Sequence, residues 1–319
     1  MTPGRSVIVT GGASGLGKIM SGYFAARGDA VTILDINAAD GVAVAAELDA
    51  VAQAQAVSDA GTKANGSSDG DAGGGNSGGS SRGGGGGGGG GGGEGGVRFE
   101  KCDVTSWTEQ KASFKAVYER LGRVDVVVAN AGISEGGRSW VVPAREREGN
   151  GLLDEPEEPG LKVLDVNLTG VVYSVKLALH YMQRNTPDAA TGSRGSIICT
   201  ASNVGLYPFP PAPLYAASKH AVVGLVRSLG PVYGLPHIGI RINALAPAVL
   251  GTDALFDNMV ITPPETLIAG VEKLIDDASL NGQVAEIHGP SVTLRPPHDV
   301  VDEDSRRNLQ EFSRFGYGQ

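Results

Sequence analysis

Short runs of apolar and β-branched residues alternate along the chain with longer segments whose apolar positions recur every three or four residues. The short runs predict buried strands, and the longer segments predict amphipathic helices. The expected strands are Ser6–Thr10, Ala30–Asp35, Val97–Asp103, Arg123–Asn130, Gly195–Ala201, Ile238–Leu245 and Gln283–Ile287. The expected helices are Gly17–Arg27, Ala38–Ala56, Thr108–Leu121, Leu161–Arg184 and Tyr215–Leu229.

This alternation predicts a particular fold class. A strand, a helix and a second strand form a βαβ unit, whose crossover is right-handed and whose strands run parallel. The valines of Arg123–Asn130 form a continuous apolar run, which is typical of a strand covered on both faces. We therefore expect a Rossmann-type α/β fold, a doubly wound parallel sheet of about seven strands with helices on both faces.

A low-complexity interval interrupts the pattern. Residues 61–96 contain 21 of the 50 glycines of the chain. They carry too few apolar side chains to offset the entropy of ordering a backbone, about 1–2 kcal/mol per residue. We expect a disordered insert at 61–96 in a single folded domain (1–60 and 97–290), followed by a C-terminal tail (291–319). The insert is interpreted as a tolerated loop expansion, with a partner-binding segment as the alternative.

Composition and charge narrow the classes of protein further. The net charge of −9 and the lack of a Lys/Arg cluster argue against binding to nucleic acid or an anionic membrane surface. No run approaches the roughly 20 apolar residues of a membrane span, and the first strand begins too early for a signal peptide. Cys102 and Cys199 lie in apolar runs and are expected to be free, buried thiols. We expect a cytoplasmic protein without a metal site.

A glycine-rich turn, Thr10–Gly17, joins the first strand to the first helix. Its spacing, G-x-x-x-G-x-G, lets the backbone turn tightly and approach a pyrophosphate, which then lies at the helix N-terminus. In this strand–turn–helix context, the turn predicts a dinucleotide site; a glycine-rich loop without a ligand is the alternative. The candidate residues are Gly11, Ser14, Gly15, Leu16 and Gly17.

Asp35 ends the second strand, 18 positions after Gly17. A carboxylate at this place accepts hydrogen bonds from the adenosine ribose and repels a 2′-phosphate. The residues that follow, 36–38, include no Arg or Lys that would bind such a phosphate. The sequence therefore predicts NAD rather than NADP as the cofactor. In the alternative reading, Asp35 only caps the next helix.

Tyr215 and Lys219 are four residues apart and therefore lie on one face of the predicted helix. A free tyrosine has a pKa near 10, and a neighbouring positive charge favours the phenolate that acid–base catalysis needs. Ser202 follows the preceding strand, at the edge of the sheet where parallel strands form a ligand crevice. Its hydroxyl is suited to bind a substrate oxygen. Ser14 and Ser218 are the alternative serines.

Asn167 lies inside a predicted helix, where asparagine lowers helix propensity. An asparagine at such a place is expected to have a specific role, such as binding a water molecule or bending the backbone.

The motifs taken together resemble the single-domain type of the short-chain dehydrogenase/reductase family. The resemblance is carried by Thr10–Gly17, Asp35, Cys102–Val104, Asn130–Gly132, Asn167, Ser202, Tyr215 and Lys219.

The resemblance implies roles for these residues. Asp103 and Val104 correspond to the pair that contacts adenine, and Asn130 lies beside the cofactor. Val249 and Thr252 match positions that contact the nicotinamide carboxamide, although Ala248 stands where the family has glycine. The implied catalytic tetrad, in which Asn and Lys hold a water that relays protons to Tyr, is Asn167, Ser202, Tyr215 and Lys219.

These observations predict an NAD-dependent oxidoreductase that transfers hydride between nicotinamide and a secondary alcohol or ketone. The apolar segment 253–267 and the stiff segment 207–213 favour a hydrophobic or lipid-like substrate, although both are equally compatible with simple packing. The alternatives are a biosynthetic reductase of polyketide- or steroid-like ketones and a non-catalytic NAD-binding regulatory protein. The family resemblance implies a homodimer or homotetramer, for which the small residues Ala217, Ala221 and Gly224 offer a helix face.

Overall fold

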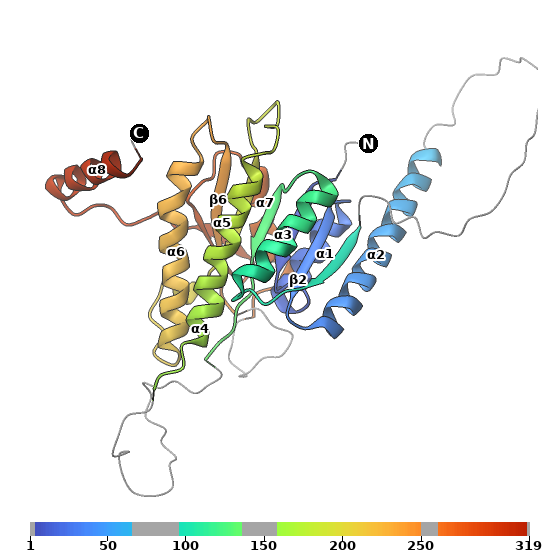
Figure 1. Cartoon of the computed structure of the whole chain (residues 1–319), viewed down its shortest axis with the longest axis horizontal. Helices are drawn as coiled ribbons and strands as arrows, with labels where there is room; N and C mark the ends of the chain where they lie inside the picture. Colours follow the sequence, from blue (N-terminus) through green and yellow to red (C-terminus); the bar gives the residue numbers. More distant parts are fainter. Residues whose placement is uncertain (1–3, 66–95, 136–157, 250–260, 318–319) are drawn as a thin grey trace, which may run out of the picture.

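The computed structural model describes residues 4–65, 96–135, 158–249 and 261–317. These residues form a sheet in the order β3-β2-β1-β4-β5-β6-β7-β8, with helices on both of its faces (Figure 1). The strands are β1 (Ser6–Thr10), β2 (Ala30–Asp35), β3 (Val97–Lys101), β4 (Val126–Ala129), β5 (Gly195–Thr200), β6 (Ile240–Pro247), β7 (Val284–His288) and β8 (Ser291–Leu294).

The helices follow the expected alternation. The α-helices are α1 (Gly15–Ala26), α2 (Ala38–Asn65), α3 (Trp107–Leu121), α4 (Lys162–Leu164), α5 (Gly170–Met182), α6 (Pro213–Tyr233), α7 (Pro264–Asp276) and α8 (Glu303–Tyr317). A π-helical turn, η1 (Asp165–Thr169), joins α4 to α5, and a 3₁₀ turn, η2 (Asn203–Gly205), follows β5. None of the described helices combines the length and the apolar character that crossing a membrane requires.

The predicted Rossmann-type fold is confirmed. Strands β1 to β7 run parallel to one another. The strands up to β3 lie on one side of β1 and those from β4 onward on the other, so the strand order reverses between β1 and β4. In sheets of this kind, the ligand crevice lies at the carboxyl ends of the strands beside that switch point. The expected number of strands was one too low, because β8 pairs antiparallel with β7 and extends the sheet.

Alternating side chains of the strands build a core on each face of the sheet. Ile8 and Val127 pack in a cluster with residues of α3, α5 and α6, whereas Val7, Val9 and Val128 pack with residues of α1, α2 and α7. All five are at most 2% exposed. A strand buried on both faces needs the continuous valine runs from which these strands were predicted.

Three expected boundaries differ from the structure. The helix expected over Leu161–Arg184 is divided by the π turn, and the interval 61–96 begins inside α2, which runs to Asn65. Residues 66–95 lie outside the described part. The expected tail at 291 instead begins with β8, because its residues pair with the edge of β7. Helix α8 then projects away from the sheet (Figure 1).

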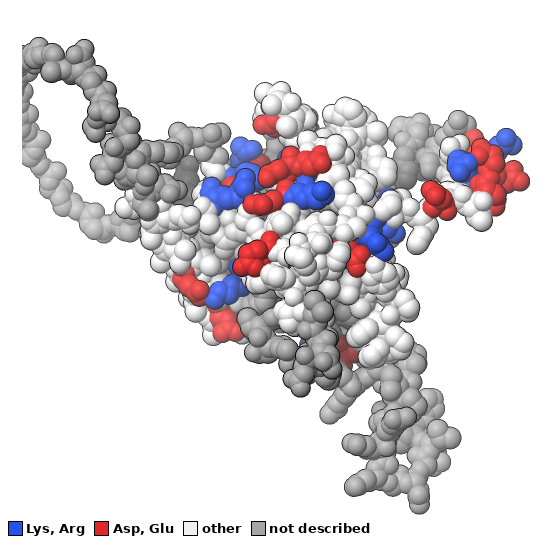
Figure 2. Space-filling view, turned by 180° about the vertical axis from the view of Figure 1, so that it is seen from behind, with Lys and Arg blue, Asp and Glu red and all other residues white. Residues whose placement is uncertain are grey.

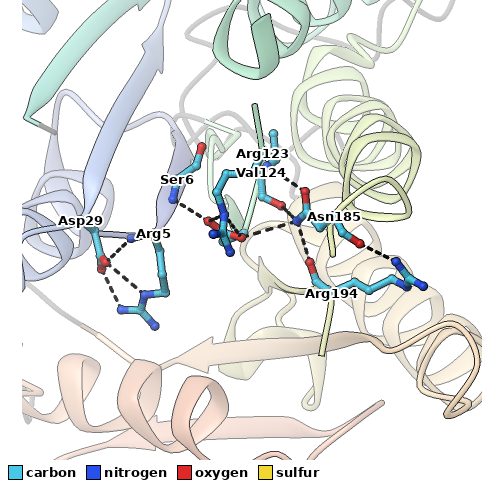
Figure 3. Close-up of polar contacts among 8 residues, drawn as sticks. Arg5, Ser6, Asp29, Arg123, Val124, Asn185 and Arg194 are labelled. Carbon is cyan, nitrogen blue, oxygen red and sulfur yellow. Dashed lines mark hydrogen bonds and ion pairs between the residues drawn. The ribbon is translucent and has the colours of Figure 1, made fainter. Parts of the chain in front are cut away.

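A polar network ties the amino ends of the strands together (Figure 3). The buried carboxylate of Asp125 accepts a hydrogen bond from the Ser6 backbone at 2.8 Å and pairs with Arg123 Nε at 2.7 Å. Asn185 Nδ2 donates to the Val124 carbonyl at 2.6 Å and to that of Arg194 at 2.7 Å. The amino ends of β1, β4 and β5 are therefore fixed to each other, on the side opposite the expected crevice.

We predict that Asp125→Ala lowers the free energy of unfolding by about 2–4 kcal/mol, because the Ser6 N–H loses its partner in a buried setting. Chemical denaturation measures this change. Glu119→Ala is the matched control, since Glu119 is exposed and pairs with the exposed Lys115 on the same helix. This control substitution should lower the free energy of unfolding by less than about 0.5 kcal/mol. Equal stability of Asp125→Ala and the wild type would contradict the role assigned to this network.

Candidate active site

A cavity of about 460 Å³ lies at the carboxyl ends of the strands, beside the switch point between β1 and β4. It collects residues that are far apart in the sequence. Of the residues predicted to bind cofactor or substrate, eleven line it: Gly11, Ser14, Gly15, Leu16, Asp35, Asp103, Val104, Asn130, Ser202, Tyr215 and Lys219.

The glycine turn forms one wall of the cavity. Gly11 and Gly15 have φ angles of +63° and +48°, a conformation that glycine adopts at little cost. A Cβ on Gly15 would meet no atom within 4 Å, so the space beside the turn is open. Ser14 precedes α1 without capping it by its side chain, and the first turn of α1 contains no acidic residue. The helix N-terminus is therefore suited to an anion such as a pyrophosphate.

Gly17 does not line the cavity but is buried beneath the turn. A Cβ at this position would lie 2.0 Å from the Gly11 carbonyl oxygen and 2.7 Å from Asn130 Nδ2. The structure therefore gives Gly17 a role in close packing between the helix and the turn.

Asp35 lies at the end of β2, with its carboxylate held in place by backbone donors. Oδ2 accepts from the Ala13 N–H at 3.1 Å, and Oδ1 accepts from the Asn37 N–H at 3.0 Å. Each carboxylate oxygen can accept more than one hydrogen bond, so these contacts leave capacity for a ligand hydroxyl. Asp35 consequently presents a fixed negative charge to the cavity.

Asp103 and Val104 line the cavity on the segment that follows β3. The Asp103 backbone donates to Glu109 Oε2 at 2.9 Å, and Glu109 belongs to the first turn of α3. The Val104 carbonyl accepts from the buried Gln110 Nε2 at 2.6 Å. The start of α3 therefore positions both residues. Burial raises the pKa of the adjacent Cys102 thiol to about 11, which leaves it protonated, and both cysteines are free and buried as expected.

Asn130 connects three strands at the cavity floor. Its Nδ2 donates to the carbonyls of Thr10 at 3.1 Å and Gly11 at 3.2 Å, and its Oδ1 accepts from Thr200 Oγ1 at 3.1 Å. The Asn130 backbone also donates to Thr10 Oγ1 at 2.9 Å. These bonds fix the ends of β1, β4 and β5 relative to one another.

Asn167 lies in the π turn and is fully buried. Its Oδ1 accepts from the Ile133 N–H at 2.8 Å, and its Nδ2 donates to the Ile133 carbonyl at 2.9 Å and to Ser218 Oγ at 3.1 Å. The side chain thus uses both amide hydrogens on protein atoms. The asparagine that disfavours a regular helix here coincides with a backbone distortion, and its side chain holds the segment after β4 against α6.

Tyr215, Lys219 and Ser202 meet at one end of the cavity. Lys219 Nζ donates to the Thr200 carbonyl at 2.8 Å and lies 5.6 Å from the centre of the Tyr215 ring. Ser202 lies beside the Tyr215 phenol, and its side chain is one of the groups that act on the pKa of Tyr215. Ser202 Oγ also lies 3.3 Å from the Pro247 carbonyl oxygen. The structure therefore brings together the three polar groups that the sequence placed on separate elements.

Burial affects the charge states of this group. It raises the pKa of Tyr215, and the side chain of Ser202 opposes the increase. Burial lowers the pKa of Lys219 from 10.5 to about 8, although the amine remains bonded to Thr200. Near neutral pH the lysine is a buried cation close to the phenol, which favours the phenolate.

Some of the predicted site residues do not line the cavity. Asn167 supports the cavity without lining it, and Val249 is likewise absent from the lining. Thr252 lies outside the described residues, as does most of the expected substrate segment 253–267. The segment 207–213 does not line the cavity, and Tyr207 Oη donates to Glu286 Oε2 on β7 at 3.0 Å.

Other residues that line the cavity were not predicted from the sequence. They include Ile133, Val166, Thr200 and Ala201. Most of them are apolar positions directly after a strand or in the π turn. Their side chains carry no recognisable chemistry, so only their place at the ends of the strands marks them. Strand-end position was the one signal that could have found them.

Elsewhere on the described surface, charge is mixed. Figure 2 shows acidic and basic side chains interspersed over the visible face. Within the described ranges, no group of three or more His, Cys, Asp or Glu residues is arranged to hold a metal ion.

Comparison with known proteins identifies the family. The short chain dehydrogenase family matches residues 92–258, just over half of the chain. Short-chain dehydrogenase/reductase prx4 of Penicillium roqueforti is 32% identical over 252 residues, which are 79% of this chain and 56% of that protein. This chain belongs to the short-chain dehydrogenase/reductase family, although it spans little more than half of the length of prx4. Members of this family are oxidoreductases that bind nicotinamide cofactors and act on CH–OH or carbonyl groups of small molecules.

Two further relatives cover most of the chain. The human NAD-dependent 15-hydroxyprostaglandin dehydrogenase is 26% identical over 308 residues, which are 89% of this chain and 91% of that enzyme. A short-chain type dehydrogenase/reductase from Mycobacterium marinum, known from a crystal structure, has a TM-score of 0.61 at 24% identity. It covers 90% of this chain and 94% of its own, and it supports the fold.

We predict that the affinity for the nicotinamide cofactor weakens by about tenfold as the pH rises through about 8. The pKa of Lys219 is lowered to about 8, so its charge is present below that pH and is lost above it. A hydrogen bond from a charged donor contributes roughly 1.4 kcal/mol more to the binding free energy than one from a neutral donor. Isothermal titration between pH 6.5 and about 9.5 measures the change.

Lys219→Met should bind the cofactor more weakly and without this pH step. Lys115→Met, on the exposed face of α3, is the matched control and should behave as the wild type. A pH step of the same size in Lys219→Met would contradict the assignment to Lys219.

Proposed function

We propose that this protein is an NAD-dependent oxidoreductase that interconverts a hydrophobic or lipid-like secondary alcohol and its ketone. The observation that carries the proposal is the meeting of Tyr215, Lys219 and Ser202 at one end of a cavity whose other walls suit a dinucleotide. Catalytic groups and a cofactor cleft at the same edge of the sheet are what a dehydrogenase reaction requires.

The residues around the cavity fit the cofactor. The open space beside Gly15 and the uncapped start of α1 would receive the pyrophosphate, and Asp35 would accept from the adenosine ribose. Asp103 and Val104 would border the adenine, and Lys219 would reach the ribose of the nicotinamide. When bound, the nicotinamide supplies the hydride acceptor or donor of the reaction.

The residues of the chain would supply the proton chemistry. In the oxidative direction, the Tyr215 phenolate takes the hydroxyl proton of the alcohol as the carbinol carbon is oxidised. Ser202 binds the substrate oxygen and stabilises the charge that develops there. The Lys219 cation favours the phenolate. Asn167 keeps the segment after β4 in place, and the family resemblance adds a water relay from this asparagine towards solvent.

NAD is favoured over NADP by the charge at the adenosine end of the cavity. Asp35 is fixed by two backbone donors, and the exposed Ile36 follows it. A 2′-phosphate would meet a carboxylate there without a compensating cation from the adjacent residues 36–38. The NAD dependence in the name of the related prostaglandin dehydrogenase supports the same choice.

Apolar residues around the reacting end support a hydrophobic substrate. Ile133, Val166 and Pro247 line the cavity, and together they would exclude water from the substrate. A cytoplasmic location and a homodimer or homotetramer complete the proposal. The small face of α6 formed by Ala217, Ala221 and Gly224 is at least partly exposed and could receive a second subunit.

We predict that Tyr215→Phe lowers kcat by at least about 100-fold while cofactor binding is retained, because the substitution removes the proton acceptor and little else. Turnover with NAD is measured across a panel of secondary alcohols that includes hydroxy fatty acids and steroids. Tyr233→Phe, the same change on the same helix, is the control and should keep wild-type activity. Activity of Tyr215→Phe near that of the wild type would refute the role of this residue.

A wild-type protein that binds NAD but oxidises none of these alcohols, and reduces none of the matching ketones with NADH, would instead favour a regulatory protein without turnover.

We predict that the wild type binds NADH at least about tenfold more tightly than NADPH, and that Asp35→Ala removes most of this preference. The substitution deletes a charged acceptor for the ribose, worth about 1.5–3 kcal/mol, and also the repulsion of a 2′-phosphate. Fluorescence titration with both cofactors measures the two affinities. Glu47→Ala is the control, since Glu47 lies on α2 and pairs with Lys18 outside the cavity. Equal affinities in the wild type would overturn the assignment of NAD.

A further inference from the structure

Helix α6, which carries Tyr215 and Lys219, begins without a cap of its own. Ala212 occupies the N-cap position and has no side chain that accepts a hydrogen bond. Pro213 follows at the first helical position and has no N–H to satisfy. Tyr215 is the third helical residue, and its backbone N–H is one that an N-cap Ser, Thr, Asp or Asn would normally bind.

Glu135 binds that donor from outside the helix. Its Oε1 accepts a hydrogen bond from the Tyr215 N–H at 2.8 Å, across 80 positions of sequence. The other oxygen, Oε2, is buried and has no hydrogen-bond partner within the described part of the chain. A carboxylate at the N-terminus of a helix is favoured by the helix dipole and by the charge-assisted bond to the backbone. The carboxylate therefore replaces the missing cap.

The segment that carries Glu135 is itself held in place. It follows β4 directly, and Asn167 binds both the N–H and the carbonyl of Ile133. Asn167 also donates to Ser218 Oγ, which donates to the Tyr215 carbonyl at 2.7 Å. The Tyr215 N–H is thus bonded directly to Glu135. The Tyr215 carbonyl is linked to Ile133, in the same segment after β4, through Ser218 and Asn167.

This arrangement determines where the phenol of Tyr215 lies. The first turn of a helix is the part that frays most readily, because its N–H groups have no partners within the helix. Tyr215 is in that turn, and its phenol must stay against Ser202. Catalysis is sensitive to such placement, since a shift of about 1 Å can cost about 100-fold in rate.

We propose that Glu135 is a positioning residue for the reaction, whose carboxylate caps α6 and fixes the position of Tyr215 relative to Ser202. The inference rests on the proposed function, because Glu135 acts on the reaction only through Tyr215. It explains why an acidic residue is half-buried directly beside the helix that carries the proton acceptor.

Three variants test the proposal. Glu135→Ala should lower kcat about tenfold, the value of one charge-assisted hydrogen bond converted at about 1.4 kcal/mol per factor of ten. Its cofactor affinity should stay within about twofold of the wild type, since Glu135 does not line the cavity. Glu135→Gln retains an acceptor oxygen and should keep most of kcat. Ala212→Ser in the Glu135→Ala background adds a local cap for the same N–H and should restore kcat.

The pH profile of kcat separates positioning from a mere loss of charge. If Tyr215 moves away from Ser202, it loses the interaction that lowers its pKa, and the rising limb of the profile moves to higher pH. If Glu135→Ala only removed a negative charge and left Tyr215 in place, the pKa of Tyr215 would fall and this limb would shift to lower pH. We expect a shift to higher pH in Glu135→Ala and its reversal in the double variant.

Two results would overturn the inference. One is a Glu135→Ala enzyme with the kcat and pH profile of the wild type, measured where Tyr215→Phe has lost activity; the proposed function would then stand. The other is a parallel loss of cofactor binding, thermal stability and activity in Glu135→Ala that Ala212→Ser does not restore, since this indicates a general role in folding. Full activity of Tyr215→Phe would instead remove the proposed function itself.

Discussion

A chain of hydrogen bonds through Asn130 connects the two halves of the cavity, and the rest of the site depends on it. Asn130 binds the Thr10 and Gly11 carbonyls at the glycine turn and accepts from Thr200 on β5. The carbonyl of Thr200 then accepts from Lys219 on α6. The turn suited to a pyrophosphate and the helix that carries the tyrosine are therefore held at a fixed separation by buried polar groups.

This chain also explains how a charged lysine is accommodated at 3% exposure. Burying an ammonium group is costly, and the low pKa of Lys219 reflects that cost. The bond to Thr200 and the neighbouring ring of Tyr215 offset part of it.

The sequence predicted most of the sheet because its strands are buried on both faces, and continuous valine and isoleucine runs mark such strands clearly. It also predicted Gly11, Asp35, Ser202, Tyr215 and Lys219 as neighbours, because chemistry-bearing residues at strand ends and on one helix face converge in a doubly wound fold. β8 was not predicted, because a short edge strand of partly exposed residues has no distinctive pattern. Helices α7 and α8 were not predicted. Helix α7 begins inside the segment 253–267, which was interpreted as favouring a hydrophobic substrate, and α8 lies in the expected tail.

The sequence by itself determined the class of fold, the glycine turn and the residue types that acid–base chemistry needs. These depend on periodicity and on local spacing, which a single chain displays directly. Only the tertiary structure decided that Gly17 packs beneath the turn, that Asn167 lies in a π turn and that Glu135 caps the helix of Tyr215. Each of these depends on a contact between residues far apart in the sequence, and such contacts follow from how the strands and helices pack rather than from any local pattern.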